Sequence, residues 1–221
     1  FGLWGNTVAG LMYISEFSGH RVRAVNMTSG KLSLFAGTGT AGSRGNDGPA
    51  SMALLTNPAG IYGDASGNVF IADFGASVVR RVSFASQIIT LVVGTGLVGF
   101  AGDNGPATSC WLNGPMGLFV DSTEAIYLTD VYNNRVRKVD QQTSVIITIA
   151  GKDASGDGGD EGPATAASLD APIGVWIDVL GNVYIADSGN NKVRAIDYRT
   201  GYIRTAAGTG LSGGGYSGDG G

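Results

Sequence analysis

Four acidic residues recur along the chain at one spacing and are the first candidates for chemistry. Each acid ends a run of alternating apolar residues, and an arginine follows it seven residues later. The acids are Glu16, Asp73, Asp130 and Asp187, and the arginines are Arg23, Arg80, Arg137 and Arg194. Carboxylates in this pattern could form a ring that binds a cation. They could instead accept N–H groups of the following turn and pair with an arginine of their own repeat or of the next one. Because a residue present in every repeat usually serves the repeat itself, we expect a structural ring of acids and arginines.

One histidine and one cysteine are the other candidates for chemistry. A catalytic zinc site needs about three N, S or O ligands, and His20 and Cys110 lie in different repeats. Together they cannot form such a site. We expect His20 in a surface turn and Cys110 as a small buried packing residue, with an intermolecular disulfide as the alternative for Cys110.

Acids and glycines also gather in the links between repeats, above all at residues 157–161. Their spacing does not fit the calcium loop of an EF-hand, which places acids at alternating positions and ends in a glutamate. We therefore expect solvated turns at these links.

Aromatic side chains occupy one equivalent position in every repeat. A ring of such side chains could stack against sugars or bases. Flat sheets also need large side chains between them, and we expect that packing role for Trp4, Tyr62, Phe119 and Trp176.

The elements that must position these residues form a repeat of about 57 residues. The pattern that begins at Tyr13 returns at Phe70, Tyr127 and Tyr184. Within the fourth copy, short runs rich in β-branched and aromatic residues alternate with Gly, Asn and Asp turns, and they predict strands at 174–178, 183–187, 192–197 and 202–207. Four antiparallel strands per repeat predict an all-β fold, a β-propeller of four-stranded blades. The blades span about 1–58, 59–115, 116–172 and 173–221, within a single region over 1–221.

Links of about 20 residues join the repeats, and they are long for a propeller. Each link begins with a glycine-rich arm and continues into a Gly-Pro-Ala motif. An acid close to a proline at a first helical position predicts one short helical turn there. Leu55, Leu112 and Leu169 follow this turn, and we expect them to pack it against the blades.

These motifs resemble the NHL repeat family. The segments 181–187 and 190–194 are similar to the core motif of the family, and the arm at 102–108 is similar to its extended linker. The resemblance implies a β-propeller, most often six-bladed, that serves as a platform for protein, glycan or RNA contacts. A few members of this family are enzymes, such as peptidyl-hydroxyglycine lyases with a zinc site in the central channel, so the resemblance also allows an enzyme.

Composition narrows the possible functions and locations. The chain has 14 basic and 18 acidic residues and a net charge of -4, which disfavours a nucleic-acid partner. No apolar run approaches the roughly 18 residues of a membrane-spanning helix, so we expect no membrane insertion. The sequence does not begin with Met, which predicts a processed chain or part of a longer one. The sequon at Asn26, Met27 and Thr28 falls in a predicted hairpin turn, and this placement favours a glycosylated protein located extracellularly or at the cell surface.

The sequence shows no histidine dyad, no activated cysteine and no phosphate-binding loop at the start of a helix. We therefore expect a non-catalytic interaction or structural module that has no cofactor and no metal and binds protein or glycan partners. Neither end has the features of a capping repeat, which predicts self-association, with a filament as one form of it, or continuation into further repeats. The alternatives are an enzyme that uses the propeller channel, with metal-dependent lyase or lactonase-like chemistry, and an RNA-binding platform.

Overall fold

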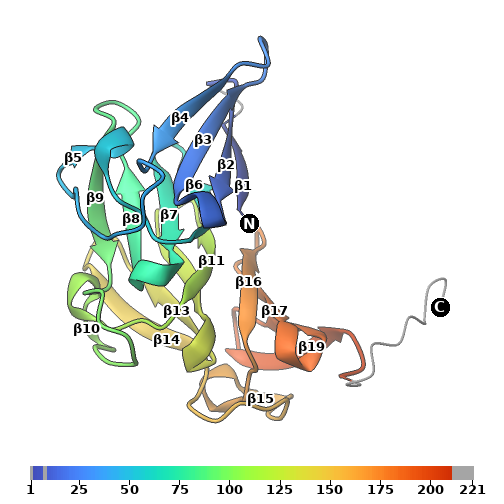
Figure 1. The fold of residues 1–221 in the computed structure, drawn as a ribbon. Coiled ribbons are helices and arrows are strands. Elements are labelled where there is room, and N and C mark those ends of the chain that lie inside the picture. Colours follow the sequence, from blue (N-terminus) through green and yellow to red (C-terminus); the bar gives the residue numbers. More distant parts are fainter. Residues whose placement is uncertain (1, 7–8, 211–221) are drawn as a thin grey trace.

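The computed structural model describes residues 2–6 and 9–210, which form four antiparallel sheets in chain order (Figure 1). We number them blades 1 to 4. Blade 1 has the strands β1 (Leu3–Asn6), β2 (Leu11–Glu16), β3 (Arg21–Asn26) and β4 (Leu32–Ala36). Blade 2 has β5 (Gly48–Pro49), β6 (Pro58–Gly63), β7 (Val69–Asp73), β8 (Val78–Val82) and β9 (Ile88–Val93).

Blades 3 and 4 repeat the arrangement of blade 2. Blade 3 has β10 (Gly105–Pro106), β11 (Pro115–Val120), β12 (Ile126–Asp130), β13 (Arg135–Val139) and β14 (Val145–Gly151). Blade 4 has β15 (Gly162–Pro163), β16 (Pro172–Ile177), β17 (Val183–Asp187), β18 (Lys192–Ile196) and β19 (Tyr202–Ala207). The prediction of four strands per blade is therefore incomplete, because a short fifth strand completes blades 2, 3 and 4.

The fifth strand comes from the arm and lies on the outer edge of the next blade. Gly48 and Pro49, for example, pair with Ile89 and Ile88 of β9. Proline is tolerated here because its missing N–H is not needed at a sheet edge. The arm thereby covers part of the outermost long strand, which would otherwise expose unpaired backbone groups.

Short 3-10 helices connect the strands. Three of them follow the arm strand, at Ala50–Met52, Ala107–Ser109 and Ala164–Ala166. The predicted helical turn therefore exists, but it starts at alanine, since the preceding proline belongs to the arm strand. Four others lie between the second and third long strands, at Phe17–Gly19, Phe74–Ala76, Val131–Asn133 and Ser188–Asn190. No helix in the described ranges is long and apolar enough to cross a membrane.

The turn and arm geometry explains two of the repeated residue types. A residue in the left-handed region follows each 3-10 helix of the second kind, and Asn134 and Asn191 suit this conformation. Gly151, at the start of an arm, has φ +87°, and a Cβ atom there would lie 2.1 Å from the carbonyl oxygen of Asn134. This position therefore requires glycine, both for its conformation and for close approach of the arm.

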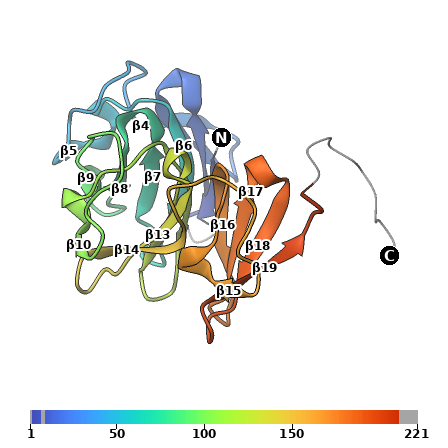
Figure 2. The same cartoon turned by 90° about the horizontal axis from the view of Figure 1, so that it is seen from below.

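The blades fan around the line where their first strands meet, and blades 1 and 4 lie at the two ends of the fan (Figure 2). Three hydrophobic clusters fill the contacts between successive blades, which we call seams. In each cluster one face of a blade packs against the opposite face of the next blade and against the arm that joins them. The leucines predicted to hold the arm are fully buried in the seams, at Leu55, Leu112 and Leu169.

Blades 1 and 4 each have one face outside the three seams. Leu3 of blade 1 is 61% exposed, whereas its counterpart Ile61 in blade 2 is 5% exposed. Val193 of blade 4 is 37% exposed, whereas its counterparts Val79 and Val136 are fully buried. The two outer faces thus carry side chains of the kind that a seam buries.

Candidate functional site

The repeated acids lie at the ends of the second long strands, where they hold the start of their own blade. Asp130 Oδ1 accepts the backbone N–H of Asn113 at 2.7 Å, just before β11. Asp187 and Asp73 accept the equivalent N–H groups of Asp170 at 2.7 Å and of Thr56 at 2.6 Å. All three acids are fully buried. Each carboxylate therefore joins the end of the arm to the inner part of the blade.

The repeated arginines pair with the acid of their own blade. Arg137 Nη1 lies 3.2 Å from Asp130 Oδ2, and Arg194 Nη1 lies 3.4 Å from Asp187 Oδ2. Both arginines also bind an acid of the arm. Arg137 Nη2 lies 2.6 Å from Oδ1 of Asp103, and Arg194 Nη2 lies 2.6 Å from Oδ1 of Asp160. A buried guanidinium is thus shared between two carboxylates, which compensates for its loss of water.

Burial raises the pKa of Asp130 and of Asp187, and hydrogen bonds oppose this effect. In blade 3 the opposing groups are Asn133, the N–H of Asn113 and Arg137. In blade 2, burial raises the pKa of Asp73 to about 7. The hydrogen bond from the N–H of Thr56 and the charge of Arg80 lower this pKa, but they offset less of the effect of burial.

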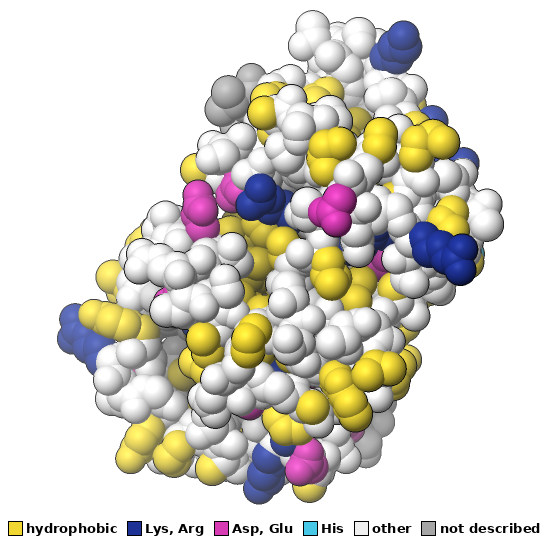
Figure 3. All heavy atoms as spheres, turned by 90° about the vertical axis from the view of Figure 1, so that its left-hand side faces the viewer, with side chains coloured by type: hydrophobic (Ala, Val, Ile, Leu, Met, Phe, Trp, Pro, Cys, Tyr) yellow, Lys and Arg dark blue, Asp and Glu magenta, His cyan; other side chains and the backbone are white. Residues whose placement is uncertain are grey.

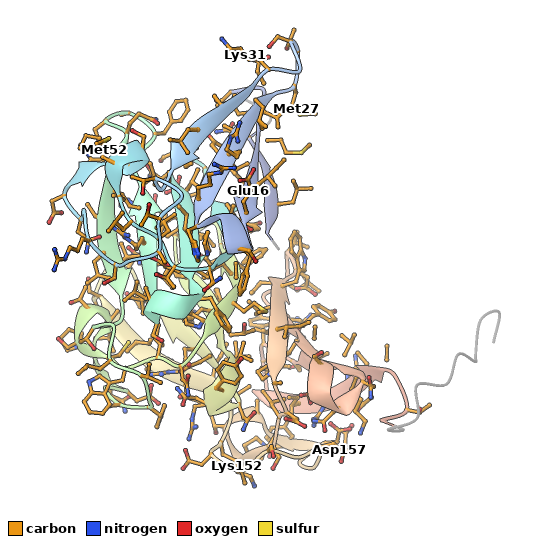
Figure 4. All side chains as sticks on the ribbon, in the orientation of Figure 1. Glu16, Met27, Lys31, Met52, Lys152 and Asp157 are labelled. Atoms are coloured by element: carbon orange, nitrogen blue, oxygen red, sulfur yellow. The ribbon has the colours of Figure 1, made fainter. Side chains whose placement is uncertain are left out.

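Blade 1 departs from this pattern because it ends the fan. Glu16 pairs with Arg21, and its Oε1 lies 3.7 Å from Nη1 of Arg23 (Figure 4). The side chain of Arg23 remains 23% exposed, whereas Arg137 and Arg194 are fully buried. The eight predicted ring residues are therefore grouped blade by blade, and the acids are not brought together. Among the described residues no group of three or more His, Cys, Asp or Glu side chains could hold a metal ion.

His20 has a structural contact that the sequence prediction missed. Its Nδ1 accepts the backbone N–H of Asn57 at 3.2 Å, across the seam between blades 1 and 2. His20 lies in the turn that the sequence predicts, but it is half-buried there and not fully at the surface. The seam between blades 3 and 4 has an equivalent contact, in which Asn134 Oδ1 accepts the backbone N–H of Ala171 at 3.1 Å.

Cys110 is fully buried in the seam between blades 2 and 3. Burial raises the pKa of its thiol to about 11, and the charge of Arg137 opposes the shift. The thiol is therefore protonated at neutral pH and has the character of a packing residue.

Two acids of the link at 157–161, Asp157 and Asp160, bind cationic side chains of the protein. Asp157, labelled in Figure 4, lies 2.6 Å from Nζ of Lys192. Asp160 binds Arg194 and accepts a hydrogen bond from Thr205 at 2.7 Å. Asp160 lies in an exposed turn, as predicted, but the sequence prediction did not include its pairing with Arg194. A sequence signal existed, since Asn46, Asp103 and Asp160 recur at the repeat spacing.

Asn26 is the last residue of β3 and directly precedes the β3–β4 hairpin turn at residues 27–29. Its Oδ1 accepts the backbone N–H groups of Thr28 at 3.0 Å and of Ser29 at 2.8 Å. Residues 27–30 are exposed.

The four repeated aromatic side chains converge where the first strands meet. The ring centroids of Tyr62 and Phe119 lie 4.7 Å apart, and those of Phe119 and Trp176 lie 4.8 Å apart. Tyr62 also contacts Trp176, two blades away, at 6.2 Å, and it contacts Trp4 at 6.3 Å. The expected packing role therefore includes contact around the axis as well as between adjacent blades.

A hollow of about 550 Å³ opens beside this cluster, and we call it the aromatic hollow. Tyr62, Phe119, Tyr127 and Trp176 line it together with the turns at 120–122 and 177–181. The side chain of Trp176 is 56% exposed, and Val179 and Leu180 are exposed beside it.

Two carboxylates at the aromatic hollow are fixed by their own turns. Asp121 Oδ2 accepts the hydroxyl of Tyr127 at 3.1 Å. Asp178 accepts hydrogen bonds from the side chain and backbone of Asn182 and from the N–H of Leu180, and these bonds lower its pKa. The hollow therefore combines an aromatic wall with carboxylate oxygens that accept hydrogen bonds.

No family model matches the sequence. The curated relatives include the chloroplastic protein SUPPRESSOR OF QUENCHING 1 of Arabidopsis thaliana, 27% identical over 86% of this chain and 18% of the relative. They also include NHL repeat-containing protein 2 of Homo sapiens, 28% identical over 90% of this chain and 30% of the relative. The chain thus spans less than a third of either relative.

Solved structures share the fold at low sequence identity. A Bacteroides thetaiotaomicron protein of unknown function matches 84% of this chain and 44% of its own, with a TM-score of 0.67 and 19% identity. A gluconolactonase from Xanthomonas campestris matches 92% of this chain and 59% of its own, with a TM-score of 0.63 and 18% identity. A streptogramin B lyase matches 93% of this chain and 53% of its own, with a TM-score of 0.61 and 11% identity. These neighbours are β-propellers, and the chain is similar to NHL repeat-containing proteins over most of its length.

Proposed function

We propose that this chain is a non-catalytic interaction module whose aromatic hollow binds protein or glycan partners. The observation that carries the proposal is the contrast between buried charge and exposed aromatic surface. The repeated acid–arginine pairs of blades 2 to 4 lie inside the seams, where they hold arms and strands. Trp176, Val179 and Leu180 are exposed instead. Tryptophan and tyrosine are enriched in the energetically important parts of protein interfaces.

The chemistry of the aromatic hollow favours a partner that donates hydrogen bonds. Asp121 and Asp178 are acceptors, and the rings of Trp176 and Tyr62 offer flat apolar faces. A sugar fits this combination, since its C–H face can lie on a ring while its hydroxyls donate to carboxylates. A protein partner fits through an arginine or lysine side chain, which would also contact the aromatic faces.

A binding experiment with two alanine variants tests this proposal. Glycan arrays and purified candidate protein partners are probed with the wild-type chain, with Trp176→Ala, and with Tyr202→Ala as the matched control. Tyr202 is also an exposed aromatic residue, but it lies on the outer strand β19, away from the aromatic hollow. We expect Trp176→Ala to weaken binding about 30-fold or more, as for a hot-spot residue. Equal binding by both variants would contradict the proposal.

The proposal includes an extracellular or cell-surface location with a glycan on Asn26. The position of Asn26 beside an exposed hairpin turn supports this. Mass spectrometry of the protein from its natural source tests it, because an occupied Asn26 adds a hexose-containing mass that Asn26→Gln lacks.

Self-association, with a filament as one form of it, or continuation into further blades is also part of the proposal. The exposed outer faces of blades 1 and 4 support it, since Leu3 and Val193 correspond to residues that are buried in the seams. Analytical ultracentrifugation over a concentration series tests it, and a monomer at all concentrations would count against self-association.

A channel enzyme remains the second candidate function. The names of the lyase and gluconolactonase neighbours favour it, together with the carboxylates at the aromatic hollow. Elemental analysis of the purified protein separates the two functions, because a stoichiometric and tightly bound divalent ion would favour the enzyme. RNA binding is less well supported, since Arg80, Arg137 and Arg194 are buried and the face in Figure 3 carries Lys and Arg only at scattered points.

A further inference from the structure

The acid–arginine pair of blade 2 lacks a hydrogen-bond donor that its counterparts have. In blade 3, Asn133 Nδ2 donates to Asp130 Oδ2 at 2.8 Å. In blade 4, Asn190 Nδ2 donates to Asp187 Oδ2 at 2.8 Å. Blade 2 has Ala76 at this position, so nothing equivalent reaches Asp73.

The arm of blade 2 also differs, because Asn46 replaces the aspartate that binds the arginine in blades 3 and 4. Arg80 Nε donates to Asn46 at 2.9 Å, and Arg80 Nη1 donates to the carbonyl oxygen of Leu54 at 2.8 Å. Arg80 Nη1 is left 3.6 Å from Asp73 Oδ2, which is farther than in blades 3 and 4. The charge of Arg80 therefore compensates Asp73 less directly.

Asp73 consequently has a buried oxygen that is poorly satisfied. Within the described part of the chain, its Oδ2 has no hydrogen-bond partner, and only Oδ1 accepts an N–H, from Thr56. A buried carboxylate in this situation is favoured in its neutral form. Consistent with this, burial raises the pKa of Asp73 to about 7, against the N–H of Thr56 and the charge of Arg80.

The neighbouring elements bring few other charges to Asp73. Arg80, on β8, is the charged group that acts on it. The arm contributes the carbonyl oxygen of Arg44, which accepts from Arg80 Nη2 at 3.3 Å. Blade 1 contributes the titratable group His20, which accepts the N–H of Asn57, the residue after Thr56.

We propose that Asp73 is a proton-binding site that couples the seam between blades 1 and 2 to pH across neutrality. Its partner Thr56 lies at the end of the arm, two residues before β6, so the charge of Asp73 acts where the arm enters the blade. The pKa in the folded chain lies above that of a free carboxyl, so protonation favours the folded seam. This contribution is complete below about pH 4, and it is lost as the pH rises through about 7.

Two reciprocal variants, Ala76→Asn and Asn133→Ala, test the proposal. Ala76→Asn supplies the missing donor, and there is room for it, because Ala76, Thr56 and Gly42 line a hollow of about 330 Å³. Asn133→Ala removes the same donor from blade 3. The side-chain carboxyl carbons of Asp73 and Asp130 are followed by NMR between pH 4 and pH 9 in the folded chain.

The wild-type chain should show an Asp73 midpoint near 7, as the raised pKa implies. Ala76→Asn should lower this midpoint by about one pH unit or more, and Asn133→Ala should raise that of Asp130 by a similar amount. Hydrogen exchange at the Thr56 amide, corrected for the intrinsic rate, should become about 10-fold faster relative to that of Asn113 between pH 6 and pH 8. A wild-type Asp73 midpoint below about 5, or an unchanged midpoint in Ala76→Asn, would overturn the proposal; the first outcome is decisive without any variant.

Discussion

The inner seams and the outer faces of the fan carry the same repeated residues in opposite surroundings. Arg137 lies in a seam, fully buried between Asp130 and an acid of the arm, whereas Arg23 lies on the outer face of blade 1 and is partly exposed. Ile89 is fully buried in a seam, whereas its counterpart Leu32 is 44% exposed. The environment of a repeat position, rather than its residue type, therefore determines how much that position contributes to stability.

The largest expected effect comes from removing a buried arginine. Arg137→Ala leaves Asp130 and Asp103 without their cation, and we expect it to lower the free energy of unfolding by about 3–5 kcal/mol. The matched change Arg23→Ala removes a partly exposed pair, and we expect it to cost about 1 kcal/mol or less. Urea unfolding of both variants measures the difference. Equal losses would mean that the outer face of blade 1 is covered in solution.

Removing a buried aliphatic side chain gives the next comparison. Ile89→Ala opens a cavity in the seam between blades 1 and 2, and we expect a loss of about 2–5 kcal/mol. Leu32→Ala removes a side chain that is almost half exposed, and we expect a change of about 0.5 kcal/mol or less. Thermal unfolding monitored by circular dichroism provides the measurement. A large loss in Leu32→Ala would again show that a further blade or chain covers blade 1.

Sequence reasoning succeeds where a contact lies within one repeat. Asp130 and Arg137 are seven residues apart on adjacent antiparallel strands, so the repeat spacing and the strand pattern give pairing within the repeat as one of the two predicted options. It fails where the contact joins an arm to the blade that the arm enters. Asp103 lies in an arm and binds an arginine 34 residues later in the chain, and no alternation within a strand indicates that contact. The two-residue arm strands were also missed, because two residues are too few to show a periodicity.

The aromatic cluster shows a second limit of sequence reasoning. The 57-residue spacing identifies Tyr62 and Trp176 as equivalent residues, but it carries no information on how strongly the fan curves. The contact between these two rings, two blades apart, depends on that curvature. Packing within a seam follows from the repeat, whereas the aromatic hollow follows from the arrangement of several blades around one axis.

The smallest expected effect concerns Cys110, a seam residue whose counterparts Ala53 and Ala167 are also fully buried. Because the other arms hold alanine at this position, we expect Cys110→Ala to cost about 1 kcal/mol, the value for losing one small buried group. Burial raises the thiol pKa to about 11, so thiolate is scarce at pH 8 and alkylation by iodoacetamide should be at least about 100-fold slower than for a free cysteine. Labelling should reach the free rate only in denaturant. Rapid labelling of the folded chain would show that the seam between blades 2 and 3 opens readily, and it would remove the distinction between seams and outer faces at this position.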